Sequence, residues 1–236
     1  MASVGVYWKF LEDARIAPIA RGVGLLAVLN IAVGLWMALF YAPMERTMGD
    51  AQRIFYFHVP SAWVGFLAFF VVFVASILFL TRRERRWDAL ALSAAEIGVV
   101  FTTLVLLTGP LWAKKAWGAF WVWDARLTTT LILWLIYVGY LMLRVTAESE
   151  RRARFAAVLA IIGFLDVPII YVSVQIWRTM HPQLIVTEPG GLAPPMVQTL
   201  MVCLLSFTLL FVYLLIQRVR LEQARDRVNA LRERME

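Results

Sequence analysis

Apolar residues gather in six long runs that are separated by short polar segments. The runs lie near residues 22–42, 62–80, 91–109, 127–145, 156–176 and 196–217. Each run has about the 20 residues that an α-helix needs to cross the hydrocarbon core of a bilayer. The runs are continuous and lack the alternation of a membrane β-strand, so they indicate helices. The pattern predicts an all-α integral membrane protein: a six-transmembrane-helix bundle over residues 1–217, followed by a helical tail over residues 218–236.

Composition supports this prediction. Of the 236 residues, 61% are hydrophobic, whereas soluble domains are about 45–50% apolar. No apolar core of a signal peptide precedes residue 22, and no small-residue cleavage pattern follows the first run, so we expect that run to be retained as the first span. The single cysteine, Cys203, lies inside the sixth run, which leaves no partner for a disulfide and is typical of a small buried apolar residue.

Basic residues are distributed unevenly between the polar segments. Seventeen of the 23 lysines and arginines lie before residue 22, in the loops near 81–90 and 144–155, or in the tail. The positive-inside rule therefore predicts that both termini are cytoplasmic and that the loops 43–61, 110–126 and 177–195 are external. The net charge of +7 follows from this asymmetry and does not indicate nucleic-acid binding.

The external loop between the third and fourth helices is rich in tryptophan. Residues 117–128 read W-G-A-F-W-V-W-D-A-R-L-T, which gives a large, flat aromatic surface followed by an acid and an arginine. Tryptophan is enriched at membrane interfaces in any case, but four of the ten fall within residues 112–123. We therefore expect Trp117, Trp121 and Trp123 to face a large planar ligand that carries carboxylates.

The acid and the arginine of this loop each have two interpretations. Asp124 precedes the fourth span, so it can cap that helix, or it can hold Arg126 or fix the loop. Arg126 can snorkel to the interface or pair with a ligand carboxylate through its planar guanidinium. Arg53 and Arg178 each lie near a histidine and are second candidates for a carboxylate contact.

Both histidines of the chain belong to the external side by the charge distribution. His58 lies at the entrance to the second span, where Pro60 suits a first helical turn, and His181 lies just past the fifth span. A histidine in a loop is usually an ordinary polar residue, but two imidazoles at similar depth beside an aromatic loop can also be axial ligands to haem iron. Zinc is the competing metal, but it needs three or four ligands, and the external loops offer two histidines and no cysteine.

Two acids lie inside predicted spans, Glu96 in the third and Asp166 near the middle of the fifth. Intramembrane acids are costly and mark candidate functional sites; they can form a proton or substrate path, or hold helices together. The tail has a narrow apolar stripe at helical spacing, which suits either a solvated or lipid-surface extension or a docking helix for a cytoplasmic partner. The stripe comprises Leu221, Ala224, Val228, Leu231 and Met235.

The motif at residues 117–128, W-G-x-x-W-x-W-D-x-R-L-T, resembles the "WWD" signature of the haem-handling proteins of cytochrome c maturation. Its ending, D-A-R-L-T, resembles the CcmC type, whereas the related CcmF and CcsA types usually read W-D-P-x-E. Six spans and one external histidine on each side of the signature are similar to CcmC as well.

The resemblance implies that His58 and His181 are the two axial ligands of a transiently bound haem b. It implies that Trp117, Trp121, Trp123, Asp124 and Arg126 hold the haem and present it at the periplasmic face of a bacterial inner membrane. The implied partners are a CcmE-type haem chaperone, CcmA- and CcmB-type ABC-transporter subunits and a small CcmD-type membrane protein. We expect no catalytic residues, because the histidine that reacts with haem belongs to the chaperone, although covalent attachment can be assisted on this surface.

Three alternatives have distinct requirements. A b-type cytochrome that moves electrons across the membrane needs two haems and about four histidines inside helices, and this chain has two histidines at one face. A small-molecule or proton transporter would use Glu96 and Asp166. A CcsA-like cytochrome c haem lyase component would act on apocytochrome directly and need no chaperone.

Overall fold

The computed structural model describes residues 16–145, 150–177, 179–181 and 191–235. Within this part of the chain, six helices are long and apolar enough to cross a membrane. The prediction of an all-helical protein with six long apolar helices is therefore confirmed. The chain is a multi-pass membrane protein.

The helices in chain order are α2 (Ile16–Trp36), the π-helix η1 (Met37–Tyr41), the 3-10 helix η2 (Asp50–Ile54), α3 (Phe55–Arg82), α4 (Arg85–Trp117), α5 (Ala125–Val145), α6 (Glu150–Phe164), α7 (Asp166–Ile176) and α8 (Pro194–Met235). Most of them extend beyond the apolar runs. The reason is that apolarity marks the part of a helix that lies in lipid, whereas the backbone hydrogen bonds continue into the polar flanks.

Two helix ends differ from the sequence-based expectation. Helix α3 begins at Phe55, so Pro60 lies in its second turn and not in its first. Helix α4 includes Pro110 and ends only at Trp117, so the first part of the expected loop 110–126 is helical. Gly118, at φ 80°, ends α4, because glycine adopts the left-handed conformation without a steric penalty. The tail is the last part of α8, which continues to Met235.

The fifth span is interrupted at Leu165, between α6 and α7. Pro168 explains the interruption, because proline has no N–H to donate and its ring collides with the carbonyl of the residue four positions earlier. The Leu165 N–H instead bonds to the Ile162 carbonyl, at 3.1 Å. The apolar run 156–176 is long enough for one membrane span, but it is divided between the two helices α6 and α7.

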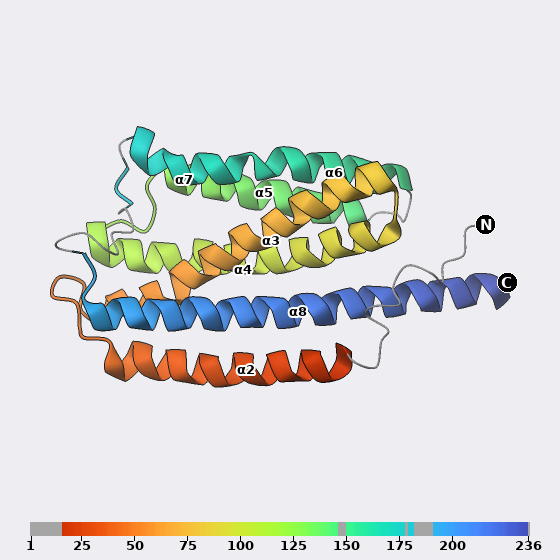
Figure 1. The fold of residues 1–236 in the computed structure, drawn as a ribbon. Coiled ribbons are helices and arrows are strands. Elements are labelled where there is room, and N and C mark those ends of the chain that lie inside the picture. Colours follow the sequence, from red (N-terminus) through yellow and green to blue (C-terminus); the bar gives the residue numbers. More distant parts are fainter. Residues whose placement is uncertain (1–15, 146–149, 178, 182–190, 236) are drawn as a thin grey trace.

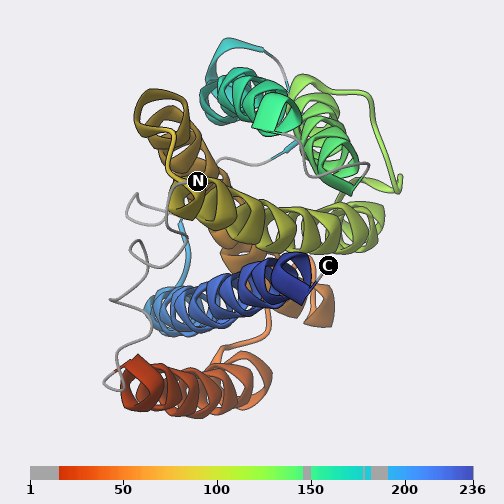
Figure 2. The same ribbon diagram turned by 90° about the vertical axis from the view of Figure 1, so that its right-hand side faces the viewer.

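Helices α3 and α4 lie in the middle of the bundle, with α2 and α8 on one side and α5, α6 and α7 on the other (Figure 1 and Figure 2). At one end lie the segments 42–54, 118–124 and 179–181, and at the other end α8 projects beyond the remaining helices (Figure 1). This arrangement brings the segments that carry both histidines and the tryptophan-rich motif to the same end.

Close packing in the centre of the bundle depends on small residues. A Cβ at Gly98 of α4 would lie 2.5 Å from Cε1 of Phe69 of α3, so only a glycine allows this approach. On its other side Phe69 stacks on Tyr137 of α5, with ring centroids 3.7 Å apart. The Tyr137 hydroxyl donates to the Ala160 carbonyl of α6, at 3.0 Å. Small residues and satisfied polar groups at helix interfaces are typical of membrane bundles.

Candidate functional site

A cavity of about 200 Å³ lies between α3, α4, α5 and α7 at the end that carries the tryptophan-rich segment. Both histidines line it, although 123 positions separate them in sequence. The lining residues are Phe55, His58, Val59, Ala62, Phe66, Thr102, Val105, Leu106, Gly109, Pro110, Trp112, Ala113, Trp117, Trp121, Arg126, Leu127, Thr130, Ile170 and His181. The cavity is thus largely apolar and aromatic, with two imidazoles and one guanidinium as its main polar groups.

His58 reaches the cavity from the first turns of α3. Its Nδ1 lies 2.9 Å from the Thr108 hydroxyl oxygen of α4. A histidine with one ring nitrogen engaged in this way keeps the other nitrogen for a further partner.

His181 is positioned by the tryptophan-rich segment itself. Thr179 donates its hydroxyl proton to Oδ2 of Asp124 at 2.5 Å, and the same hydroxyl oxygen accepts the backbone N–H of His181 at 3.1 Å. Oδ1 of Asp124 accepts the Leu127 N–H at 2.9 Å, which caps the start of α5. Asp124 therefore fulfils the capping role and also fixes the loop that carries His181.

The tryptophans of the motif have different positions. Trp117 and Trp121 line the cavity, and their buried indole nitrogens have no hydrogen-bond partner among the described residues. Trp123 is 76% exposed and packs edge-on against Trp121, with centroids 5.5 Å apart. Two of the three predicted ligand-facing indoles thus line the cavity, and the third lies outside it.

The three candidate arginines also differ. Arg126, in the first turn of α5, lines the cavity. Arg53 pairs instead with Asp50 at 3.0 Å and donates to the Ala38 carbonyl, and it is not among the lining residues. Arg178 lies outside the described residues.

Three residues of the site were not predicted from the sequence. Trp112 lines the cavity and packs edge-on against Trp117, at 5.4 Å between centroids; its membership of the cluster of four tryptophans was the available signal. Thr108 and Thr179 contact the two histidine segments. No sequence signal identifies them, since threonine is common in loops and membrane helices.

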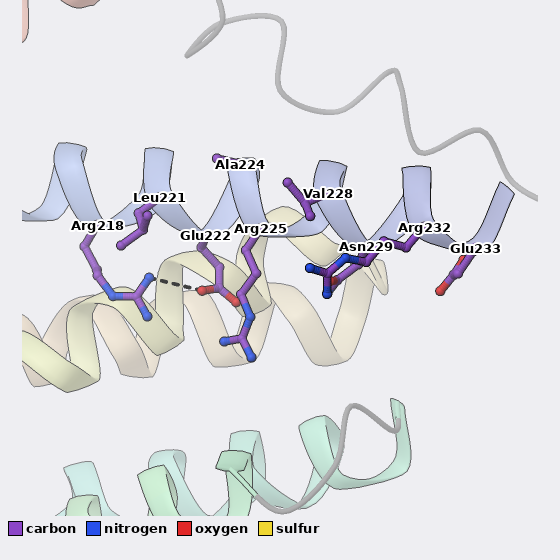
Figure 3. A pocket seen from close by; sticks show the side chains of 9 residues that line it. All are labelled: Arg218, Leu221, Glu222, Ala224, Arg225, Val228, Asn229, Arg232 and Glu233. Atoms are coloured by element: carbon purple, nitrogen blue, oxygen red, sulfur yellow. Dashed lines mark hydrogen bonds and ion pairs between the residues drawn. The ribbon is translucent and has the colours of Figure 1, made fainter. Parts of the chain in front are cut away.

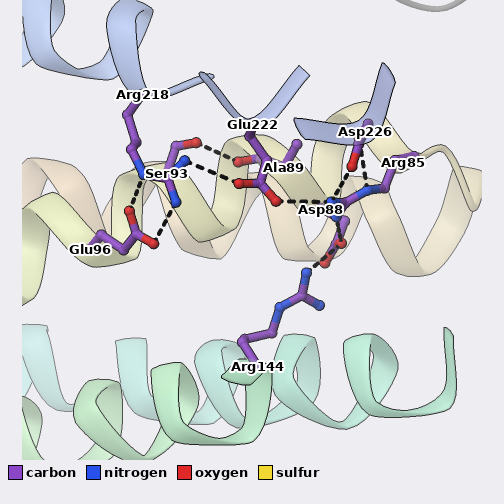
Figure 4. A network of polar contacts seen from close by, with 9 residues as sticks. All are labelled: Arg85, Asp88, Ala89, Ser93, Glu96, Arg144, Arg218, Glu222 and Asp226. Carbon is purple, nitrogen blue, oxygen red and sulfur yellow. Dashed lines mark hydrogen bonds and ion pairs between the residues drawn. The ribbon is translucent and has the colours of Figure 1, made fainter. Parts of the chain in front are cut away.

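The acids within the spans are not among the residues that line the cavity. Glu96 accepts two hydrogen bonds from Arg218 of α8, one of them at 2.7 Å, as part of a network that joins α4, α5 and α8 (Figure 4). In the same network Asp88 pairs with Arg144 at 2.6 Å. The helix-holding interpretation therefore fits Glu96. Oδ2 of Asp166 is buried and has no hydrogen-bond partner among the described residues.

The tail packs one face against α4 and exposes the other. Glu222 is buried and pairs with Arg85 of α4 at 3.0 Å. The predicted apolar stripe is exposed, with Leu221 62% and Met235 81% accessible. Leu221, Ala224 and Val228 follow one another along α8 (Figure 3). The stripe is thus available at the end of the bundle opposite to the cavity.

Comparison with known proteins adds a family match over nearly the whole chain. The model of the family "Heme exporter protein C" (CcmC) matches residues 7–234. The heme exporter protein C of Bradyrhizobium diazoefficiens is 40% identical over 94% of this chain and 85% of its own length. The Haemophilus influenzae protein of the same name is 35% identical over 85% and 83%, and that of Escherichia coli K12 is 33% identical over 90% of both chains.

Proposed function

Because the chain belongs to the heme exporter protein C (CcmC) family and acts in haem export for cytochrome c biogenesis, we propose that it binds haem b as transient cargo in the cavity beside the tryptophan-rich segment. His58 and His181 are the axial ligands of the iron. The observation that carries this proposal is that the only two histidines of the chain line one apolar, aromatic cavity together with an arginine.

The remaining polar groups of the cavity suit the propionates. Arg126 can bind a carboxylate through two parallel hydrogen bonds, and the indole N–H groups of Trp117 and Trp121 are donors without a partner among the described residues. The neighbouring apolar surface and the indole rings suit the porphyrin plane. Arg178 stays a prediction for the same role, while the contacts of Arg53 with Asp50 and Ala38 argue against it.

We further propose that this end of the bundle faces the periplasm of a bacterial inner membrane and that both termini are cytoplasmic. The support is the distribution of charge, because 17 of the 23 basic residues belong to the segments expected inside.

A CcmE-type chaperone collects the haem at this face. The cavity volume of about 200 Å³ is below the roughly 300–1,000 Å³ of pockets that enclose a ligand, so part of the macrocycle stays outside. Trp123 and Phe120, 76% and 55% exposed, provide an aromatic surface beside that edge. The histidine that bonds covalently to haem is the chaperone's, so this chain supplies binding and orientation and no catalytic residue. CcmA- and CcmB-type ABC-transporter subunits and a CcmD-type protein complete the assembly.

The axial ligands are tested by absorption spectra of the detergent-purified protein, oxidised and reduced, beside His58→Ala, His181→Ala and the double variant. We expect a low-spin haem spectrum in the parent, a high-spin spectrum in each single variant, and a return to low spin when imidazole is added. A variant that returns to low spin with imidazole is folded and lacks only the ligand, whereas a variant that has lost its fold does not recover. If each single variant binds haem and loads the chaperone like the parent, the ligand assignment is wrong.

Presentation to the chaperone is tested separately with Trp123→Ala. The expected result is an unchanged low-spin spectrum with a lower yield of haem covalently attached to the chaperone. Trp36→Ala is the matched control, because Trp36, the last residue of α2, is an exposed indole (56% accessible) that packs on Tyr41 instead. Equal loading by both variants and the parent would refute a role for the exposed indole.

A further inference from the structure

The Thr108 hydroxyl, on α4, takes part in two hydrogen bonds. Its oxygen lies 2.7 Å from the carbonyl oxygen of Leu104, one helical turn earlier, and 2.9 Å from Nδ1 of His58. A hydroxyl has one proton, and a carbonyl oxygen only accepts. The Thr108 proton therefore points to Leu104, and the Thr108 oxygen has to accept a proton from His58.

This proton count determines the tautomer of His58. With the hydrogen on Nδ1, the neutral imidazole carries its free lone pair on Nε2. Metal-binding histidines usually donate their second ring N–H to an oxygen acceptor, which orients the ring and increases the basicity of the ligating nitrogen. Thr108 stands in the place of that acceptor.

Gly109, the next residue of α4, makes room for the same ring. A Cβ at this position would lie 3.3 Å from Cε1 and 3.9 Å from Nδ1 of His58. The first distance is closer than ordinary carbon–carbon contact, at about 3.5–4.0 Å, so an alanine at this position would require the imidazole to shift slightly. Thr108 and Gly109 thus hold the ring edge that carries Nδ1 and Cε1 against α4.

We propose that Thr108 is a positioning residue for haem binding: its hydroxyl accepts the Nδ1–H of His58 and so keeps Nε2 of that histidine free and oriented for the iron. The proposal rests on the proposed function, in which His58 is an axial ligand. In this proposal α4 contributes to haem binding through Thr108 as well as through Trp117, its last residue.

The test compares Thr108→Val, which removes the hydroxyl at similar volume, with Thr108→Ser, which keeps it. Thr103→Val is the matched control on the same helix. The Thr103 hydroxyl likewise donates to the carbonyl four residues earlier, at 2.7 Å, and accepts a ring N–H, that of Trp134, at 2.8 Å. It does not line the cavity.

Each purified variant is titrated with haem, and the midpoint potential of the bound haem is measured. For Thr108→Val we expect haem affinity to fall by about 10- to 100-fold, the usual effect of losing such a partner. We also expect the potential to rise, because the imidazole donates less electron density to the iron. Thr108→Ser and Thr103→Val are expected to behave like the parent in both measurements.

The possible outcomes separate the proposal from its premise. A Thr108→Val protein with parental affinity and potential, or a Thr103→Val protein that changes as much, would overturn the role of Thr108. Haem binding that is insensitive to His58→Ala would overturn the proposed ligand and the positioning role with it. If Thr108→Val does not fold, Thr108→Ala removes the same hydroxyl with a smaller side chain, and parental affinity and potential in that variant would overturn the proposal.

Discussion

The link between Asp124, Thr179 and His181 predicts that a residue outside the tryptophan-rich motif controls haem affinity. In Thr179→Val the hydroxyl is lost, and with it the 2.5 Å hydrogen bond to the Asp124 carboxylate and the 3.1 Å hydrogen bond from the His181 N–H. The segment that carries His181 then loses the hydrogen bond that joins it to Asp124 at the start of α5. The histidine is expected to spend less time in the position where it ligates the iron.

The magnitude follows from the two bonds. A hydrogen bond to a charged group contributes about 1.5–3 kcal/mol, and a neutral one about 0.5–1.5 kcal/mol. Both are part-buried, so water replaces some of the loss and the lower limits apply, which gives about 2 kcal/mol. At about 1.4 kcal/mol per factor of ten, haem affinity should fall roughly 30-fold.

The assay is titration of the haem-free protein, followed by difference absorption, with Thr179→Ser as the control that retains the hydroxyl. Because the link lies in a connecting segment, the thermal unfolding midpoint should change little. An unchanged Kd in Thr179→Val would refute the reasoning. So would an equal loss in Thr179→Ser, since the hydroxyl would then not be the group that matters.

Three further predictions concern the rest of the molecule. In thermal unfolding, Gly98→Ala should destabilise the bundle by about 1–3 kcal/mol, which is the usual cost of overpacking. Gly139→Ala should leave the stability unchanged, because a Cβ added there meets nothing within 4 Å. Glu96→Gln and Arg218→Gln should each lower the unfolding temperature and leave the haem spectrum unchanged. Because the two side chains are paired, the double variant should lose less stability than the sum of the two single losses. Strict additivity would contradict the pairing. Backbone N–H groups of the following turn, that of Met48 foremost, lower the pKa of Glu45 below its usual 4.5. A lowered pKa stabilises this turn above pH 4.5 and loses that effect as pH falls through the folded-state value. The protection of the turn's amides relative to their intrinsic exchange rate should therefore fall there in the parent and stay constant with pH in Glu45→Gln.

Much of the fold follows from local pattern. Six runs of about 20 apolar residues can satisfy their backbone in lipid only as helices, and the described part of the chain contains six long apolar helices. The helix ends were less predictable. The apolar run in α4 stops near residue 109, but the helix continues through Pro110 to Trp117, because the ends depend on capping and on contacts with neighbouring helices and not on lipid solubility alone.

The sequence by itself determined the class of the protein, the number of long helices, the family signature and the residue types of the candidate site. Hydrophobic length, charge asymmetry and a rare aromatic cluster are all local properties, and local properties can be read along a chain. Only the tertiary structure decided that His58 and His181 line one cavity, that Asp124 reaches Thr179, and that the Thr108 hydroxyl lies within hydrogen-bond distance of Nδ1 of His58. Those contacts join positions 50 to 123 residues apart, and they arise from the packing of whole helices, which no single segment encodes.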